Sequence, residues 1–370
     1  MRFLMLNWRD PANPKSGGAE RVSLAYLEGL RERGHEVAWF ANEFPRCKAE
    51  EVIRGIQVVR GGGSGKSIVM ARRWYRRQKP FDLVMDQHHG IPWFAPWWSN
   101  TNCVAYIHEV LGPIWDAFYS WPIGTIGRFQ ERWTHWLYRK VPFWTPSEST
   151  KRALHANGVR DVTVFHNGTD ATPLPILDEK PLVQPLRLIA VCRLAPNKRV
   201  DHAIEVAKLL LKRGTQVHLT IVGGGESESQ LKESAKESDL AAHITFAGQL
   251  SEAQKDAELR RAHILLHTSM REGWGLNVIE ANAMGTPAVV YPVGGLVDST
   301  IHNETGVVSP SETPGSLADC LLQLLRSPAE YDRLRLNAWE RAKQLQWNVV
   351  RPPVCDWLES KAKGSSQFGR

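Results

Sequence analysis

Short apolar runs alternate with longer amphipathic segments through the first half of the chain. The amphipathic segments have the spacing of helices that bury one face, and the apolar runs have the length of buried strands. This alternation predicts a parallel sheet covered by helices. The expected strands are residues 2–8, 36–41, 56–60, 82–87, 103–108, 141–145 and 162–166, and the expected helices are residues 18–33, 66–79, 126–140 and 147–156.

The same pattern restarts after a proline-rich stretch at residues 173–185. We therefore predict an α/β protein with two Rossmann-like, doubly wound parallel-sheet domains that face across a cleft, where the carboxyl ends of strands converge. The expected second-half strands are residues 186–193, 217–222, 243–247, 264–268 and 288–291. The expected boundaries are a first domain at residues 1–170, a linker at 171–185, a second domain at 186–347 and a C-terminal helical segment at 348–370.

The composition is typical of a globular protein that can form two cores. Of 370 residues, 42% are apolar and 23% are charged. The five cysteines are scattered and form no CxxC pair, which argues against a disulfide framework or a zinc ribbon and fits a reducing cytoplasm. The first apolar run is too short for a signal peptide, and the apolar stretch at residues 91–98 is too short to span a membrane. We expect a cytoplasmic protein.

The charge is unevenly distributed along the chain. The whole net charge of +7 lies within residues 1–170, and eleven of the fifteen tryptophans lie there too. A nucleic acid or an anionic membrane would be attracted to such a surface. A basic face beside a Trp-rich core is the plainer interpretation, and composition does not decide between them.

Residues 271–287, REGWGLNVIEANAMGTP, hold the strongest functional pattern. They follow a strand, turn through two glycines and enter an apolar helix, whose free amides and positive dipole end form a phosphate site. Glu272 and Glu280 lie roughly 12 Å apart along an ideal helix axis, so they would face the two ends of an elongated ligand. The structural alternative is a buried helix residue at Glu280 and a helix cap at Glu272.

This segment resembles the signature of retaining nucleotide-sugar glycosyltransferases of family 4, which have the GT-B fold. The other matching motifs occur in the family's order: SGGAERV at 16–22, YIHE at 106–109, TPSESTKRAL at 145–154, HNGTD at 166–170, CRLAPNKRVDHAI at 192–204 and TIVGGGE at 220–226. The resemblance covers nearly the whole chain and implies that the segment at 348–370 crosses back to the first domain. Asn277 departs from the family, which more often has an apolar residue there.

The resemblance assigns donor binding mainly to the second domain. It implies that Arg193 and Lys198 neutralise the donor diphosphate, on which negative charge grows as the nucleoside diphosphate leaves. Gly17 and Gly18 would let a first-domain loop close on the same phosphates. The alternatives are two solvated cations and an ordinary helix start.

The resemblance also implies which residues lie at the transferred sugar. Glu272 would contact its hydroxyl groups, His108 would lie beside it, and Glu280 would bind the ribose hydroxyls of the nucleotide. A satisfied structural histidine is the alternative for His108. The implied reaction is a front-face displacement in which the leaving phosphate takes the acceptor proton, so no general base is assigned. The backbone that would hold sugar and phosphate belongs to Gly273, Trp274, Gly275 and Leu276.

The chain contains no Asp-x-Asp pair that could hold a divalent metal on a sugar nucleotide. Basic residues and a helix terminus would have to replace the ion. We therefore expect a metal-independent retaining hexosyltransferase with no metal and no cofactor, for which a UDP- or GDP-sugar is a substrate.

Two other functions stay open at this point. Residues 60–67, RGGGSGKS, follow a strand and precede a helix as in a P-loop NTPase or kinase, and Asp86 imitates the metal-binding strand end of such enzymes. However, Arg60 occupies the position of the first P-loop glycine. A basic nucleic-acid-binding protein is the other alternative, although the arginines lack a recognisable RNA-binding or helix-turn-helix context and no nucleic acid is expected.

A basic amphipathic segment at residues 66–79 indicates where the protein would meet its acceptor. On a helical wheel the basic residues of this segment occupy one half and its apolar residues the other, except Val69. Such a helix can lie on an anionic membrane, or its apolar side can pack on the first domain's sheet. The resemblance adds a glycan, lipopolysaccharide or lipid-linked acceptor, with peripheral contact at the cytoplasmic face of the inner membrane. The tryptophans that would anchor the segment or line an acceptor groove are Trp93, Trp97, Trp98, Trp115 and Trp121.

The sequence does not determine the donor base, the sugar, the acceptor, the linkage or the oligomeric state.

Overall fold

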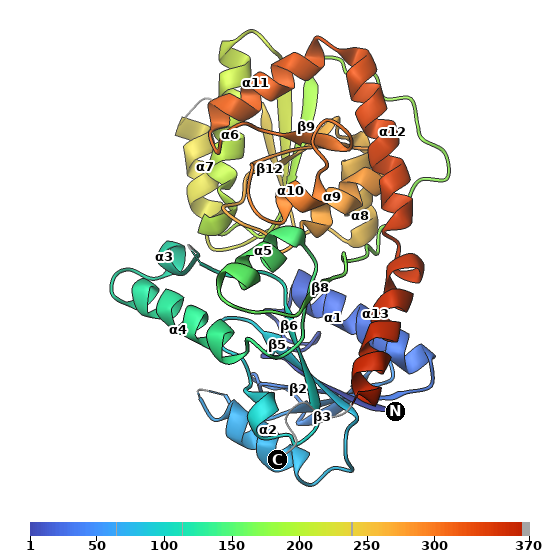
Figure 1. The fold of residues 1–370 in the computed structure, drawn as a ribbon. Helices are drawn as coiled ribbons and strands as arrows, with labels where there is room; N and C mark the ends of the chain where they lie inside the picture. Colours follow the sequence, from blue (N-terminus) through green and yellow to red (C-terminus); the bar gives the residue numbers. More distant parts are fainter. Residues whose placement is uncertain (64, 113, 238–239, 365–370) are drawn as a thin grey trace. The chain divides into compact units, whose positions relative to one another are not determined.

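The computed structural model describes residues 1–63, 65–112, 114–237 and 240–364. They form two compact units, each built around a sheet flanked by helices (Figure 1). Among the described residues, unit 1 comprises those of 1–112, 122–168 and 347–364, and unit 2 comprises those of 114–121 and 169–346. Residues 365–370, at the end of the predicted C-terminal segment, lie outside the described residues.

Unit 1 contains an eight-stranded sheet in the order β3-β4-β2-β1-β5-β6-β7-β8. All its pairs are parallel except β3 with β4. Its strands are β1 (Arg2–Leu6), β2 (Glu36–Ala41), β3 (Glu50–Ile53), β4 (Ile56–Arg60), β5 (Leu83–His88), β6 (Asn102–Ile107), β7 (Phe143–Thr145) and β8 (Val162–Val164). Its helices are α1 (Gly18–Glu32), α2 (Ser67–Tyr75), η1 (Ala95–Trp97), α4 (Ile123–Leu137), α5 (Glu148–Ala156) and α13 (Trp347–Lys363).

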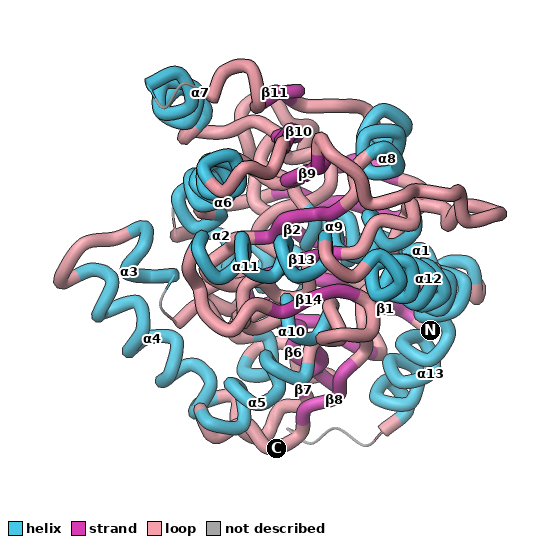
Figure 2. Tube along the Cα trace, turned by 90° about the horizontal axis from the view of Figure 1, so that it is seen from above, coloured by secondary structure: helices cyan, strands magenta, loops and turns pink. Residues whose placement is uncertain are grey.

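Unit 2 contains a six-stranded parallel sheet in the order β11-β10-β9-β12-β13-β14. Its strands are β9 (Leu186–Val191), β10 (Val217–Val222), β11 (Ile244–Gly248), β12 (Ile264–His267), β13 (Ala288–Val290) and β14 (Gly306–Val308). Its helices are α3 (Ile114–Phe118), η2 (Pro196–Lys198), α6 (Val200–Lys212), α7 (Glu228–Glu237), α8 (Glu252–Arg261), α9 (Leu276–Ala283), α10 (Leu296–Ser299), α11 (Pro314–Leu325) and α12 (Pro328–Gln344). Figure 2 shows the strands of the two sheets in magenta and their helices in cyan.

The central strands are nearly continuous apolar runs because helices cover both faces of a parallel sheet. In β1 the side chains from Phe3 to Leu6 are all fully buried, and the strand pairs in parallel with β2 and β5. The predicted two-sheet α/β fold is thereby confirmed. The short strands β3 and β14 were not predicted, because Glu50–Ile53 begins with two glutamates and Gly306–Val308 has only three residues.

The final helix, α13, packs against α1 within unit 1 (Figure 1). Arg33, directly after α1, forms ion pairs with Asp356 and Glu359, with nitrogen–oxygen distances of 2.6 and 3.0 Å. A Cβ added at Gly29 would lie 3.0 Å from the Cys355 sulfur, so the two helices approach closely. These contacts hold α13 to α1 even though the helix contains two prolines.

The apolar side of α2 packs on the core of unit 1. Ile68, Trp74 and Tyr75 contact a buried cluster that includes Trp93 and Trp98. Because both of these tryptophans belong to the core, the prediction that they anchor the protein in a membrane interface is wrong. Of the other three candidates, Trp97 and Trp121 are exposed and Trp115 is partly buried.

No helix among the described residues has the length and apolarity needed to cross a bilayer.

The burial of His263 in the core of unit 2 makes the stability of the fold depend on pH. The His263 side chain is fully buried, and its Nδ1 accepts a hydrogen bond from the Arg187 backbone N–H at 3.1 Å. Burial, reinforced by neighbouring cations, lowers the pKa of His263 to about 3. In the unfolded chain this histidine binds a proton near pH 6.5, so acidification favours unfolding over the interval between the two pKa values.

We predict that His263→Asn, which retains an acceptor for Arg187, reduces the acid sensitivity of unfolding. Between about pH 7 and about pH 5 the variant should lose up to about 2 kcal/mol less free energy of unfolding than the original chain. Urea titrations at the two pH values measure this difference. His302→Asn, at an exposed histidine that accepts the Val308 N–H, is the control. An identical pH response in all three proteins would contradict the assignment.

Candidate functional site

The loop after β9 is in direct contact with the loop after β10. Gly223 and Gly225 of the second loop have φ angles of 129° and 156°. A Cβ at Gly223 would lie 1.9 Å from the Cys192 carbonyl oxygen, and one at Gly225 would lie 2.4 Å from that of Leu194. Only glycine permits this approach. The TIVGGGE motif therefore positions the loop that carries Arg193 and Lys198.

An ion pair joins this loop to the one that follows β12. Lys198 Nζ contacts Glu272 Oε1, which also accepts a hydrogen bond from Ser269 Oγ at 2.9 Å. His267 Nε2, at the end of β12, lies 3.5 Å from the same carboxylate oxygen. Burial would raise the pKa of Glu272, but Lys198 and His267 outweigh it and hold the pKa below its usual value. Two opposite charges are thus fixed at the carboxyl ends of β9 and β12.

The segment between Glu272 and α9 is shaped by close backbone contacts. A Cβ at Gly295 would lie 2.1 Å from the Glu272 carbonyl oxygen, and the Glu272 N–H donates to the Gly294 carbonyl at 3.1 Å. Gly275 adopts a φ of 96° immediately before α9. The Trp274 side chain is buried beneath the Arg341 guanidinium. Trp274 can therefore offer a ligand its backbone but not its ring.

Asn277 connects α9 to the ends of two strands. Its Nδ2 donates to the Val191 carbonyl at 2.6 Å, and its side chain also bonds to His267. An apolar residue could make neither bond. Burial lowers the pKa of His267 to about 4, so its imidazole is neutral near pH 7. Asn277 thus fixes the start of α9 relative to the carboxyl end of β9.

Glu280 lies about one turn into α9 and is held by a lysine that the sequence pattern did not indicate. Its Oε2 lies 3.0 Å from Nζ of Lys255, which also pairs with Glu252 at 2.7 Å. Burial alone would lower the pKa of Lys255, but the two carboxylates raise it above its usual value. Glu280 is thus a buried residue of α9 with a cationic partner, and its role at the ribose stays a prediction.

The predicted residues of unit 2 fall into two groups. Lys198, Glu272 and the start of α9 lie together at one edge of the sheet, with the exposed side chain of Arg193 on the same loop as Lys198. Glu280 and Lys255 form the second group. Across the described residues, no three His, Cys, Asp or Glu side chains form a group that could hold a metal ion.

His108 follows β6 in unit 1. Its Nε2 accepts a hydrogen bond from Gln87 Nε2 at 3.0 Å, and its Nδ1 lies 3.4 Å from the Tyr106 hydroxyl. Burial, with a smaller effect of His89, lowers the pKa of His108 to about 3. The imidazole is therefore neutral near pH 7 and can exchange hydrogen bonds but carries no charge. The sequence predicts that His108 directly follows a buried strand. It does not predict that Gln87 is the hydrogen-bond partner of His108.

Gly17 and Gly18 begin α1. The Gly17 N–H donates to Glu20 Oε2 at 2.7 Å, and the other oxygen of Glu20 lies 3.2 Å from Arg9 Nε. Arg9 also donates to the Lys15 carbonyl, so it closes the loop between β1 and α1. The sequence analysis missed Arg9, which has no spacing signal of its own.

Residues of the P-loop-like segment form hydrogen bonds and ion pairs with each other and with other residues of unit 1. Arg60 forms a buried bidentate pair with Asp10 at 2.7 and 2.8 Å, and the Gly63 N–H donates to Ser67 Oγ. Burial raises the pKa of Asp86 to about 6, and its carboxylate is occupied by three hydrogen-bond donors. This geometry does not support the P-loop hypothesis. The donors to Asp86 are Trp93 N, Ala95 N and Tyr138 Oη.

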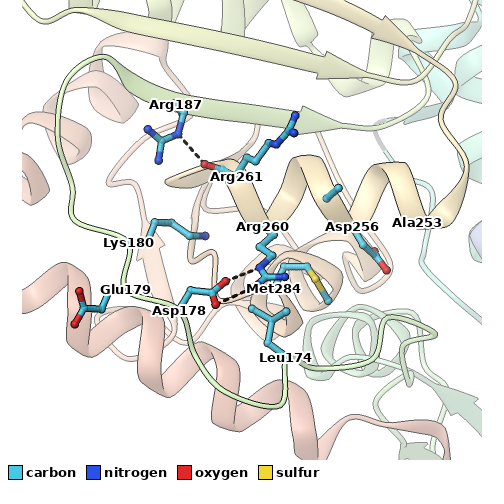
Figure 3. Close-up of a pocket in the computed structure, with 11 residues that line it drawn as sticks. Leu174, Asp178, Glu179, Lys180, Arg187, Ala253, Asp256, Arg260, Arg261 and Met284 are labelled. Carbon is cyan, nitrogen blue, oxygen red and sulfur yellow. Dashed lines mark hydrogen bonds and ion pairs between the residues drawn. The ribbon is translucent and has the colours of Figure 1, made fainter.

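A cavity of about 730 Å³ lies near the amino end of β9 in unit 2 (Figure 3). Its charged side chains are largely paired: Arg260 holds Asp178, and Arg187 donates to the Arg261 carbonyl. Lys180 donates to two backbone carbonyls and a threonine hydroxyl, and burial lowers its pKa to about 6. These bonds attach the predicted linker to unit 2 and account for the polar lining.

Two family models match the chain in succession. The model "Glycosyltransferase Family 4" matches residues 16–172, and "Glycosyl transferases group 1" matches residues 178–341. The chain belongs to the family 4, group 1 glycosyltransferases. The resemblance noted in the sequence is thereby confirmed.

Curated relatives of this glycosyltransferase include two mycobacterial proteins. A glycogen synthase of Mycobacterium tuberculosis is 28% identical over 253 residues, which cover 67% of this chain and 61% of that protein. The chain thus spans less than two thirds of that relative. A phosphatidyl-myo-inositol mannosyltransferase of Mycobacterium leprae is 25% identical over 368 residues, with 95% of each chain covered.

Several solved structures have a similar fold. A sucrose-phosphate synthase from Thermosynechococcus elongatus superposes with a TM-score of 0.78 at 19% identity, covering 97% of this chain and 98% of that one. Anabaena HepE, in complex with UDP and glucose, gives a TM-score of 0.74 at 17% identity, covering 97% and 100%. At this identity the likeness shows the fold alone. It confirms the GT-B architecture of this glycosyltransferase.

We predict that Lys198 and Glu272 are energetically coupled. Each side chain is less than one fifth exposed, so removing one partner leaves the other charge poorly solvated. A double-mutant cycle of Lys198→Met and Glu272→Gln, measured by urea unfolding near pH 7, should give a coupling of about 1 kcal/mol or more. Arg213→Met and Asp319→Asn, which disrupt a more exposed pair in unit 2, form the control cycle. Strict additivity at Lys198 and Glu272 would contradict this geometry.

Proposed function

We propose that the protein transfers a hexose from a nucleoside-diphosphate sugar to a hydroxyl group of a glycan, lipopolysaccharide or lipid-linked acceptor, with retention of anomeric configuration. In this proposal unit 2 binds the donor and unit 1 serves the acceptor. Family membership supports the reaction class. The observation that carries the donor site is the Lys198–Glu272 pair beside the start of α9.

The donor diphosphate would bind where positive charge and backbone amides lie together. Arg193 and Lys198 would contact phosphate oxygens, and the first amides of α9, which have no intrahelical acceptors, would add further donors. Glu272 would accept hydrogen bonds from the sugar, and Glu280 from the ribose. Because Lys255 already orients Glu280, the carboxylate is prepared for such a contact.

The reaction would replace one bond to the anomeric carbon by another on the same face of the sugar. The bond to the β-phosphate oxygen breaks, the acceptor oxygen forms the new bond, and its proton goes to the leaving diphosphate. Negative charge therefore grows on oxygens near Arg193 and Lys198. These two cations would stabilise the transition state more than the bound substrate. The neutral His108 would contribute a hydrogen bond at the sugar. These fixed cations would perform the task of a divalent ion, so we propose metal-independent transfer.

The relatives suggest the range of donors and acceptors. The names of two relatives indicate a glucan product and a phosphatidyl-inositol acceptor, and one structural neighbour holds UDP and glucose. The positive charge of the first 170 residues suits an acceptor that carries phosphate or lies at an anionic surface. We therefore favour a lipid-linked or lipopolysaccharide acceptor over a neutral soluble glucan.

Screening UDP- and GDP-sugars in the presence of EDTA tests the donor site. We expect one donor series to raise the melting temperature, since a ligand at a hundred times its Kd adds about 2.7 kcal/mol to folding stability. Arg193→Ala and Lys198→Ala should each abolish most of this stabilisation and most transfer activity. Glu272→Ala should abolish transfer while leaving the fold intact.

Arg213→Ala is the matched control for this screen. Arg213 ends α6 in the same unit and pairs with Asp319 away from the candidate site. This variant should respond to the donor like the original chain. Unchanged donor binding in Arg193→Ala and Lys198→Ala, or a strict requirement for a divalent ion, would contradict the proposal.

A further inference from the structure

Helix α4 presents its apolar side to solvent. Its outer face, defined here as Ile123, Ile126, Phe129, Trp133 and Trp136, has side chains between 48% and 74% exposed. Their spacing of three and four residues places them within an arc of about 140° around the helix axis. Scattered exposed apolar residues are normal on proteins, but a continuous stripe with three aromatic rings is not.

The opposite side of α4 is buried although it is small and polar. Its buried residues, Gly124, Gly127, Glu131, Thr134 and His135, occupy an arc of about 100°. An ordinary surface helix would bury the apolar stripe and expose the polar side. The amphipathic pattern of α4 is therefore inverted with respect to the core of unit 1.

Specific bonds fix this inverted orientation. The Glu131 carboxylate accepts the Leu111 N–H at 2.7 Å and the Gly112 N–H at 2.9 Å. His135 Nδ1 also bonds to Asn157 Nδ2 at 3.1 Å. Rotating α4 to bury its aromatic rings would break these bonds and leave a buried carboxylate without donors. The apolar stripe is thus held outward by the structure.

The charges beside the stripe indicate what covers it. Arg128, Arg132 and Lys140 are exposed on or directly after α4, and Arg139 stacks on the Trp136 ring at 4.3 Å. The sole acidic residue of α4 is the buried Glu131. Helical spacing places Arg128 and Arg132 on one flank of the outer face, where they can contact lipid phosphates while the rings enter the interface.

We infer that the outer face of α4 docks on an anionic lipid bilayer. Tryptophan and arginine side by side suit the headgroup region, where the indole ring is partly desolvated and the guanidinium meets phosphate. This surface replaces residues 66–79 as the membrane contact, since the apolar side of α2 is packed in the core. The inference rests on the proposed function for the class of acceptor, and it can be measured without any sugar transfer.

Cosedimentation with vesicles tests the inference on the full chain. The probes are phosphatidylcholine vesicles with and without roughly 30 mol% phosphatidylglycerol. We expect binding to the anionic vesicles, reduced at least about tenfold by Phe129→Ser, Trp133→Ser and Trp136→Ser combined, because the insertion of three rings is lost. Arg128→Gln with Arg132→Gln should weaken binding to anionic vesicles by about tenfold and reduce its salt dependence.

A matched variant controls for the loss of exposed apolar surface. Val52→Ser, Val69→Ser and Ile91→Ser combined remove three exposed apolar side chains of unit 1 outside α4. This control should bind vesicles like the original chain, and all variants should keep its melting temperature and its response to the nucleotide sugar.

Two results would overturn the inference. One is equal vesicle binding by the α4 triple variant and the original chain. The other is a lipid-free dimer of the original chain that the triple variant converts to a monomer, because the stripe would then cover a second copy. Vesicle binding through α4 without any response to nucleotide sugars would instead defeat the proposed function and leave this inference standing.

Discussion

The ion pair between Lys198 and Glu272 is the contact on which the candidate site depends. It joins the loop after β9 to the loop after β12, two neighbouring strands of the unit 2 sheet. Without it, a cation and an anion with little exposure would each lose an oppositely charged partner, and the two loops would be joined by hydrogen bonds such as that from the Met270 N–H to the Asn197 carbonyl. Gly223 and Gly225 permit the β10 loop to pack on the β9 loop, and Gly295 permits the turn before α10 to pack on Glu272.

Much of the fold could be predicted because its signals are local. The apolar runs that became β1, β2 and β13 are buried along nearly their whole length, so hydrophobicity alone identifies them. The segment at 271–287 combines a strand end, two glycines and a helix start, and the structure contains all three. The strands β3 and β14 and the short helices α3 and α10 escaped prediction, because each has only three to five residues, too few to show a hydrophobic period.

The site was harder to predict where a residue acts through a partner. Lys255 has the appearance of an ordinary helix lysine, and its role is visible only from its pairing with Glu280. Asn277 was noticed as a departure from the family, but its bond to the end of β9 requires the folded sheet. Helix α4 could be predicted as a helix but not in its orientation, because an amphipathic pattern does not tell which side faces the core. In α4 the polar side does.

The central claim is that fixed cations of unit 2 bind the terminal phosphate of the donor nucleotide. The most direct test is a calorimetric titration in EDTA, in which a nucleoside diphosphate and the matching monophosphate are each added to the protein. The titrations compare the original chain with a double variant that combines Arg193→Ala and Lys198→Ala. The account predicts that the original chain binds the diphosphate more tightly than the monophosphate. In the double variant the ratio of the two dissociation constants should be close to one. An unchanged preference in that variant, or diphosphate binding only when magnesium is added, would contradict the account.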